Sequence, residues 1–238
     1  MRALLVLCLV LFHVQSVLAH YVWVTVDDKE GDKGTANIYF EGSASPGKGE
    51  HLDPFVKRGK IWIRTPDGEA KNLKAIDFKR KVKDREQRWL KATLPDSGPR
   101  SVDMYGKWGV YAYGKTNVLL HYYGRAIQFG TNDELAKLSR AKHMNFEIAP
   151  TVVDGTLQVQ VLFKGEPKAK ASVRIRGPKG FNKTLTTSED GIVTLPKDAT
   201  AKGKYSFYSK TEFKTEGKDD GKDYSIIRHH ATLLLTIP

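Results

Sequence analysis

The sequence is poor in cysteine and has no long hydrophobic run. Its single cysteine, Cys8, lies inside the apolar stretch 3–12, so the remaining chain has no thiol for a disulfide, a thiolate nucleophile or a cysteine-ligated zinc site. The apolar stretch has about ten residues, whereas a helix needs about 20 to cross a bilayer. Stability must therefore come from packing, and no membrane span is predicted.

The sequence also lacks familiar enzyme signatures and an excess of acidic residues. It has no His-Glu-x-x-His, no Gly-x-Ser-x-Gly and no phosphate-binding glycine loop, which makes an enzyme less favoured than a binding protein. Lys and Arg number 39 against 27 Asp and Glu, for a net charge of +12. Because these cations are scattered rather than grouped around aromatic residues, we expect a solvated surface with anionic envelope polymers, not nucleic acid, as partners.

The first 19 residues have the pattern of a secretory signal. Arg2 precedes the apolar stretch, and Val17-Leu18-Ala19 matches the small-residue pattern before a cleavage site. Cleavage there predicts a periplasmic or secreted protein that begins with His20. An N-terminal histidine offers a divalent metal its free α-amine and its ring Nδ1, which close a chelate ring that no internal histidine can form. A metal site at His20 is therefore predicted.

Two further histidines are predicted to complete this site. His229 and His230 are neighbours on a predicted final strand, so their side chains point to opposite faces and one of them can serve a single site. We favour His229, which shares its face with apolar residues. His121 lies in an apolar strand and is either a ligand or a histidine satisfied within the core. The predicted metal set is His20, His229 and His121, and imidazoles without thiolates suit nickel or copper better than zinc.

The remaining histidines are not predicted to bind the metal. His51 lies on a loop beside the carboxylates of Glu50 and Asp53, and we expect it to face solvent. His143 follows a predicted helix, where a positive charge complements the negative end of the helix dipole.

Most other segments have the composition of β-strands separated by turn residues. Thr131 and Glu134 form a capping box, which predicts one short helix over 135–142. The predicted fold class is all-β, with two immunoglobulin-like β-sandwich domains and the helix near their junction. We place these domains at 20–145 and 150–238. The predicted strands are 21–26, 35–40, 60–64, 74–82, 88–94, 108–113, 117–123, 156–163, 171–176, 183–187, 191–195, 204–209 and 226–237.

Several segments together resemble a known family. They are His20-Tyr21-Val22-Trp23 and the stretches 105–111, 119–123, 145–150, 155–167 and 229–233. With them, nearly the whole mature chain resembles the bacterial periplasmic proteins grouped with the NikM-like component of nickel uptake, most strongly from residue 144 onward. The resemblance implies a periplasmic β-sandwich protein in nickel handling, with a membrane metal transporter as partner. This chain differs from the transporter component in lacking membrane helices.

The second half carries a further resemblance, based on 171–175 followed by 186–191. It is similar to transthyretin-like or carboxypeptidase-regulatory-like modules, which are usually non-catalytic.

The sequence therefore predicts an exported protein that binds nickel or copper for metal uptake or handling. Two alternatives stay open. One is a non-catalytic envelope adhesion module in which the histidines are incidental. The other is a copper-dependent oxidative enzyme that uses a histidine brace, because an amine with two imidazoles beside an open coordination position suits that chemistry.

Overall fold

The computed structural model describes residues 20–28, 33–196 and 201–238 of the chain. Strands dominate these residues, so the all-β prediction is confirmed. The predicted signal, 1–19, lies outside the described residues. Among the described residues, none of the helices has the length and apolar character that a bilayer crossing requires.

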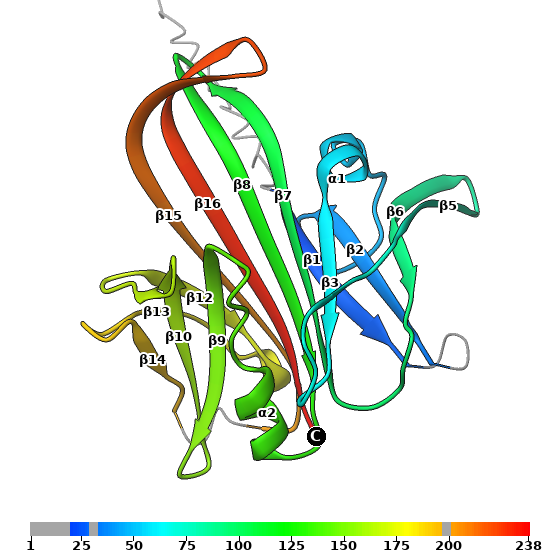
Figure 1. Ribbon diagram of the computed structural model, residues 1–238, viewed down its shortest axis with the longest axis vertical. Coiled ribbons are helices and arrows are strands. Elements are labelled where there is room, and N and C mark those ends of the chain that lie inside the picture. The colour runs from blue at the N-terminus through cyan, green and yellow to red at the C-terminus, as the bar shows by residue number, and fades with distance from the viewer. Residues whose placement is uncertain (1–19, 29–32, 197–200) are drawn as a thin grey trace, which may run out of the picture.

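One large sheet runs through the middle of the molecule (Figure 1). Its strand order is β13-β12-β15-β16-β8-β7-β3-β4. The last strand of the chain, β16, pairs in parallel with β8, so residues from both halves of the chain share this sheet. The bounds are β3 Lys60–Arg64, β4 Lys71–Asn72, β7 Arg100–Tyr113, β8 Thr116–Gln128, β12 Ser172–Arg176, β13 Asn182–Thr186, β15 Gly203–Asp219 and β16 Lys222–Ile237.

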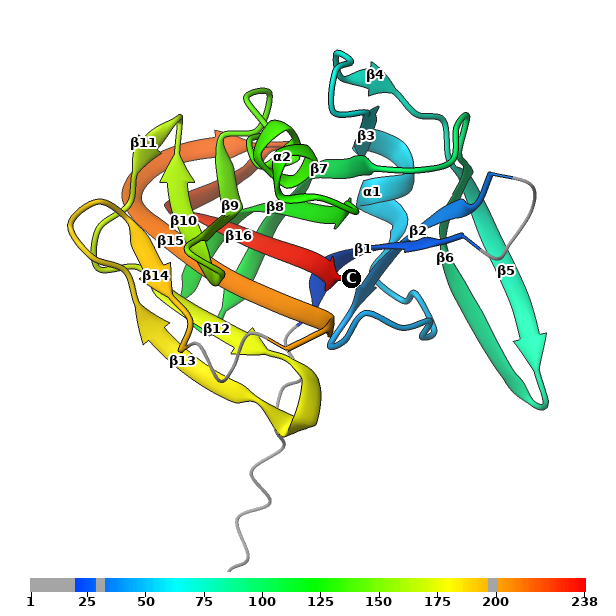
Figure 2. The ribbon, with the colours of Figure 1, turned by 90° about the horizontal axis from the view of Figure 1, so that it is seen from below.

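Two smaller sheets cover opposite faces of the large sheet (Figure 2). On the first face, β1-β2-β6-β5 encloses a core that includes Val22, Leu90 and Tyr122. On the second face, β9, β10, β11 and β14 enclose another core. The bounds are β1 Tyr21–Asp27, β2 Thr35–Glu41, β5 Ile76–Val82, β6 Arg85–Thr93, β9 Phe146–Val153, β10 Thr156–Phe163, β11 Glu166–Pro167 and β14 Ile192–Thr194.

The central strands explain why the two halves are not separate at the expected boundary near 145–150. Along β8, Val118, Leu120 and Tyr122 enter the first core, whereas Tyr123 and Ile127 enter the second. A strand covered on both faces has a continuous apolar sequence rather than an alternating one. The chain does change layers at this boundary when β9 begins, but β12, β13, β15 and β16 then return to the shared sheet.

Two short α-helices flank the sheets in the described part of the chain. The predicted one, α2 (Asn132–Leu138), begins at the capping box, where Thr131 Oγ1 accepts from the Glu134 amide at 3.3 Å and Glu134 Oε2 accepts from the Thr131 amide at 3.0 Å. It ends four residues earlier than predicted. The other helix, α1 (Asp53–Arg58), was not predicted, although Pro54 and Gly59 are placed as proline and glycine often are at helix ends.

Candidate metal centre

The structure brings His121 and His229 together on the second face of the large sheet. The two residues are direct register partners on β8 and β16. Their rings stack with centroids 4.9 Å apart and an interplanar angle of 17°. His121 Nδ1 lies 2.9 Å from the Tyr105 hydroxyl, and His229 Nδ1 lies 3.2 Å from the Tyr123 hydroxyl. A tyrosine therefore fixes one nitrogen of each ring.

Both rings of this pair are uncharged at neutral pH. Burial, followed by the positive charge of Lys107, lowers the pKa of His121 to about 4. Burial, followed by His121 and Lys164, lowers the pKa of His229 to about 3. Aromatic rings of Phe146, Phe163 and Phe213 surround His229, which explains its poor solvation. The pair therefore has the character of a satisfied core cluster.

His20 lies on the first face of the large sheet and does not join this pair. Tyr122 follows His121 on β8, and His230 follows His229 on β16. Because neighbouring side chains on a strand point to opposite faces, Tyr122 and His230 lie on the first face. His20 lines a cavity together with these two residues. The thickness of the sheet thus separates His20 from His121 and His229. Within the described residues, no group of three or more His, Cys, Asp or Glu residues could hold a metal ion.

His20 instead contacts His51. The two rings are nearly perpendicular, at 88°, with centroids 5.6 Å apart. His20 Nε2 lies 3.7 Å from Glu41 Oε2, and Phe40 packs beside the His20 ring. Since Glu41 faces Nε2, the other ring nitrogen of His20, Nδ1, is the one that remains for a ligand.

Tertiary contacts hold His51 in this position. The Gly49 amide donates to Glu41 Oε1 at 3.1 Å, and Trp108 Nε1 donates to the His51 carbonyl oxygen at 3.3 Å. The loop between β2 and α1 is therefore folded back over the end of β1, where His20 lies. The His51 side chain is exposed, as predicted, but it faces solvent beside His20.

A cavity of about 250 Å³ opens beside the two histidines. Its exposed aromatic residues, Tyr111 and Tyr113, reach this face because of a β-bulge between Lys107 and Gly109. A bulge adds one residue to a strand and reverses the faces of the residues beyond it. The cavity is lined by His20, Tyr21, Phe40, His51, Trp108, Tyr111, Tyr113, Leu120, Tyr122 and His230.

His230 is the buried histidine of this cavity. Its ring stacks on Tyr122 with centroids 4.8 Å apart, and its Nδ1 lies 2.9 Å from the Tyr208 hydroxyl. Its Nε2 is buried and has no hydrogen-bond partner among the described residues. Burial, followed by Arg228 and Lys210, lowers the pKa of His230 to about 3.

Sequence reasoning missed the importance of His51 and His230. The alternation along β16 correctly separates His229 from His230, but it suggests that His230 faces water because Arg228 and Thr232 share its face. In the structure, β1 covers that face, and His230 is only 6% exposed. No local pattern marks His51, because its loop is positioned by contacts with Glu41 and Trp108.

Comparisons with known proteins show no family for this chain. No family model matches it. Nonribosomal peptide synthetase 32 of Fusarium pseudograminearum is 23% identical over 193 residues, which are 73% of this chain, and the chain spans 2% of that protein.

Two solved structures are only distantly similar. A BSP domain of a biofilm-associated protein is 9% identical, with a TM-score of 0.20, over 85% of this chain and 27% of that chain. The D0-D1 domain of intimin is 13% identical, with a TM-score of 0.21, over 91% of this chain and 97% of that chain. Scores this low carry no argument about function.

Proposed function

We propose that the mature chain is an exported protein that binds copper or nickel through His20 and His51. The observation that carries this proposal is the perpendicular contact between these two rings, at 5.6 Å, with Glu41 beside His20 Nε2. Cleavage after Ala19 would add the α-amine of His20. The donor set would then be the amine, His20 Nδ1 and one nitrogen of His51.

This donor set has the chemistry that the metal requires. Neutral nitrogens without thiolates suit copper(II) and nickel(II), and copper(II) binds most tightly at a given nitrogen site. A histidine ligand commonly directs its second ring nitrogen at a carboxylate, which orients the ring and makes it a better donor. Glu41 has this position. The α-amine is a main-chain group, so two histidine residues together supply three nitrogen ligands.

Removal of His51 is expected to abolish tight metal binding. Glu41→Gln should lower the affinity by about 10- to 100-fold, which is typical for loss of a residue that supports a ligand, and His51→Ala should lower it further. The measurement is calorimetric titration of mature protein with copper and with nickel, after mass spectrometry has verified that the chain begins at His20.

The matched controls are His121→Ala and His229→Ala. They remove imidazoles from the opposite face of the sheet and should leave the affinity within about twofold of the unchanged protein. If these variants lose affinity while His51→Ala does not, the site proposed here is wrong and the metal set predicted from the sequence is right. If none of the variants changes the affinity, an adhesion module with incidental histidines becomes the better reading.

One added residue tests the role of the amine. A mature chain with a single alanine before His20 keeps both imidazoles but loses the chelate ring between the amine and Nδ1. We expect its copper affinity to fall by at least about 10-fold, measured by competition with a chelator. Equal affinity with and without the added alanine would contradict the chelate.

A copper-dependent oxidative enzyme is a second candidate, favoured by the open position of the site. His51 is exposed, and Tyr111 and Tyr113 are 44% and 43% exposed at the rim of the neighbouring cavity. Such a surface leaves room for a substrate beside the metal. Copper-loaded protein should then consume oxygen with a reductant faster than His51→Ala does. Equal rates of oxygen consumption in the two proteins would contradict the enzyme and leave metal binding as the proposed function.

A further inference from the structure

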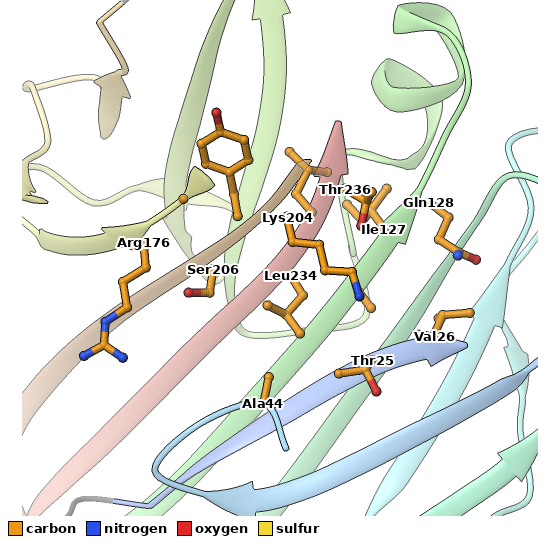
Figure 3. A pocket seen from close by; sticks show the side chains of 14 residues that line it. Thr25, Val26, Ala44, Ile127, Gln128, Arg176, Lys204, Ser206, Leu234 and Thr236 are labelled. Carbon is orange, nitrogen blue, oxygen red and sulfur yellow. The ribbon is translucent and has the colours of Figure 1, made fainter. Parts of the chain in front are cut away.

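A second groove, of about 300 Å³, lies on the first face of the large sheet near the carboxyl ends of β8 and β16 (Figure 3). Its floor is formed by β8, β15 and β16, and Arg176 and Gly177 line it from the β12 side. Thr25 and Val26 of β1 and Ala44 of the loop that follows β2 form the opposite wall. None of the residues that line the groove is acidic. The groove contains none of the histidines discussed above.

Strand register places the lining residues of the floor in rows. Arg176 pairs with Ser206 across β12 and β15, Ser206 pairs with Leu234 across β15 and β16, and Leu234 pairs with Ala126 across β16 and β8. In the next row, Lys204 pairs with Thr236. Paired residues point to the same face of a sheet. The two cations therefore share a face with Ser206, Leu234, Ala126 and Thr236, whose side chains are apolar or hydroxylated.

The charges of this groove are not balanced within the described residues. Arg176 and Lys204 make no ion pair with any described acidic residue, whereas Arg58, Arg88, Arg100, Arg125 and Arg228 all do. Figure 3 shows the Lys204 side chain extending across β16, whereas the Arg176 side chain lies beyond Ser206 and points away from Lys204. Two cations in a groove that no described acidic residue lines produce a local positive potential that attracts an anion.

The apolar part of the groove limits which anion fits. Val26, Ala44, Ala126 and Leu234 provide surface for a hydrocarbon chain, and burial of such a chain is favourable roughly in proportion to its area. The volume is at the lower end of the range of about 300 to 1,000 Å³ that is usual for small-molecule sites. An inorganic anion would leave this surface exposed to water, and a neutral lipid would leave the cations unused.

We propose that this groove binds a small organic anion, a carboxylate on a short aliphatic chain. Lys204 attracts the carboxylate directly, Arg176 adds to the positive potential of the groove, and the hydroxyls of Ser206 and Thr236 are available as hydrogen-bond donors at the floor. The aliphatic chain lies against Leu234 and Ala126. This site is independent of the metal centre, because the two share no lining residue.

Octanoate is the probe that tests this proposal. Calorimetric titration of metal-free mature protein at low ionic strength should show saturable binding of one octanoate per chain. Lys204→Gln should weaken the affinity about tenfold and Arg176→Gln by less, and both differences should shrink as salt screens the charges. Ala44→Leu should weaken binding of the aliphatic chain by narrowing the groove.

The controls separate charge from apolar contact. Lys183→Gln removes an exposed cation of β13 outside the groove and should bind octanoate like the unchanged protein. Octanol and octylammonium should bind at least tenfold more weakly than octanoate. Circular dichroism verifies that each variant is folded. Equal binding of octanol and octanoate, an unchanged affinity in both cation variants, or a lack of saturable binding would each overturn the proposal.

Discussion

The free energy of unfolding is expected to fall steeply as the pH is lowered from about 6.5 to about 4. Burial lowers the pKa of His121 to about 4 and the pKa values of His229 and His230 to about 3. In this window the unfolded chain, with histidine pKa values near 6.5, binds protons that the folded chain does not. Each histidine then removes about 1.4 kcal/mol of stability per pH unit, or about 4 kcal/mol per unit for all three near pH 5.

The charged groups around these three rings also disfavour protonation of the folded chain. Lys107 and Lys164 face the His121 and His229 pair, and Arg228 and Lys210 face His230, so cations oppose protonation on both faces of the sheet. Asp219 acts in the other direction on His121, but it is already paired with Lys107. Asp103 has a pKa lowered to about 2, and its contribution is lost only below about pH 4.

The measurement is urea unfolding at pH 7, 6 and 5 with circular dichroism. His229→Phe keeps a ring in the aromatic cluster but cannot be protonated. The slope of its unfolding free energy against pH should therefore be smaller by the contribution of one proton, about 1.4 kcal/mol per pH unit. His51→Phe, at an exposed position, is the matched control and should keep the full slope. A free energy of unfolding that is the same at pH 5 and pH 7 would contradict the prediction.

Replacement of Arg125 by methionine is expected to destabilise the protein by about 3 to 5 kcal/mol. The Arg125 side chain is 1% exposed, and its Nε donates to Asp103 Oδ1 at 2.9 Å. Its terminal nitrogens donate to the carbonyl oxygens of Leu138 at 2.9 Å and Ser139 at 2.6 Å, and Nη1 lies 3.4 Å from Glu147 Oε2. Without the guanidinium, buried Asp103 would lose its cationic partner Arg125, the carbonyl oxygens at the end of α2 would lose their donor, and Glu147 would keep Arg140 and the Ala141 amide.

Arg140→Met is the matched control for this prediction. Arg140 also bonds Glu147, at 3.0 Å, but its side chain is 39% exposed. An ion pair in such a position contributes about 1 kcal/mol or less. Urea unfolding at pH 7 should therefore show a much larger loss for Arg125→Met than for Arg140→Met. Similar losses in the two variants would show that the buried network does not hold α2 and β9 against the large sheet.

The Arg125 network also shows what His143 does. Its Nε2 lies 3.3 Å from Asp103 Oδ2, and its ring packs on Trp62 with centroids 4.5 Å apart. The sequence predicted an interaction with the end of the helix, whereas the structure places His143 beside the carboxylate that Arg125 holds. This residue therefore belongs to the junction between α2 and the large sheet rather than to a metal site.

The sequence alone determined the features that depend on neighbouring residues. Alternation along a strand separated His229 from His230, and the spacing of Thr131 and Glu134 located the start of α2. Strand composition established the all-β class. Each of these depends on hydrogen bonds or side-chain directions within a few residues, so the local sequence contains the necessary information.

Only the tertiary structure decided which histidines meet. Pairing of β16 with β8 aligns His229 with His121, although the two are more than 100 residues apart, and the contacts of Glu41 and Trp108 bring His51 to His20. The bulge beside Gly109 turns Tyr111 and Tyr113 toward the same cavity. Such contacts follow from the packing of whole layers, and a period of two along one strand cannot tell which layer will cover each of its faces.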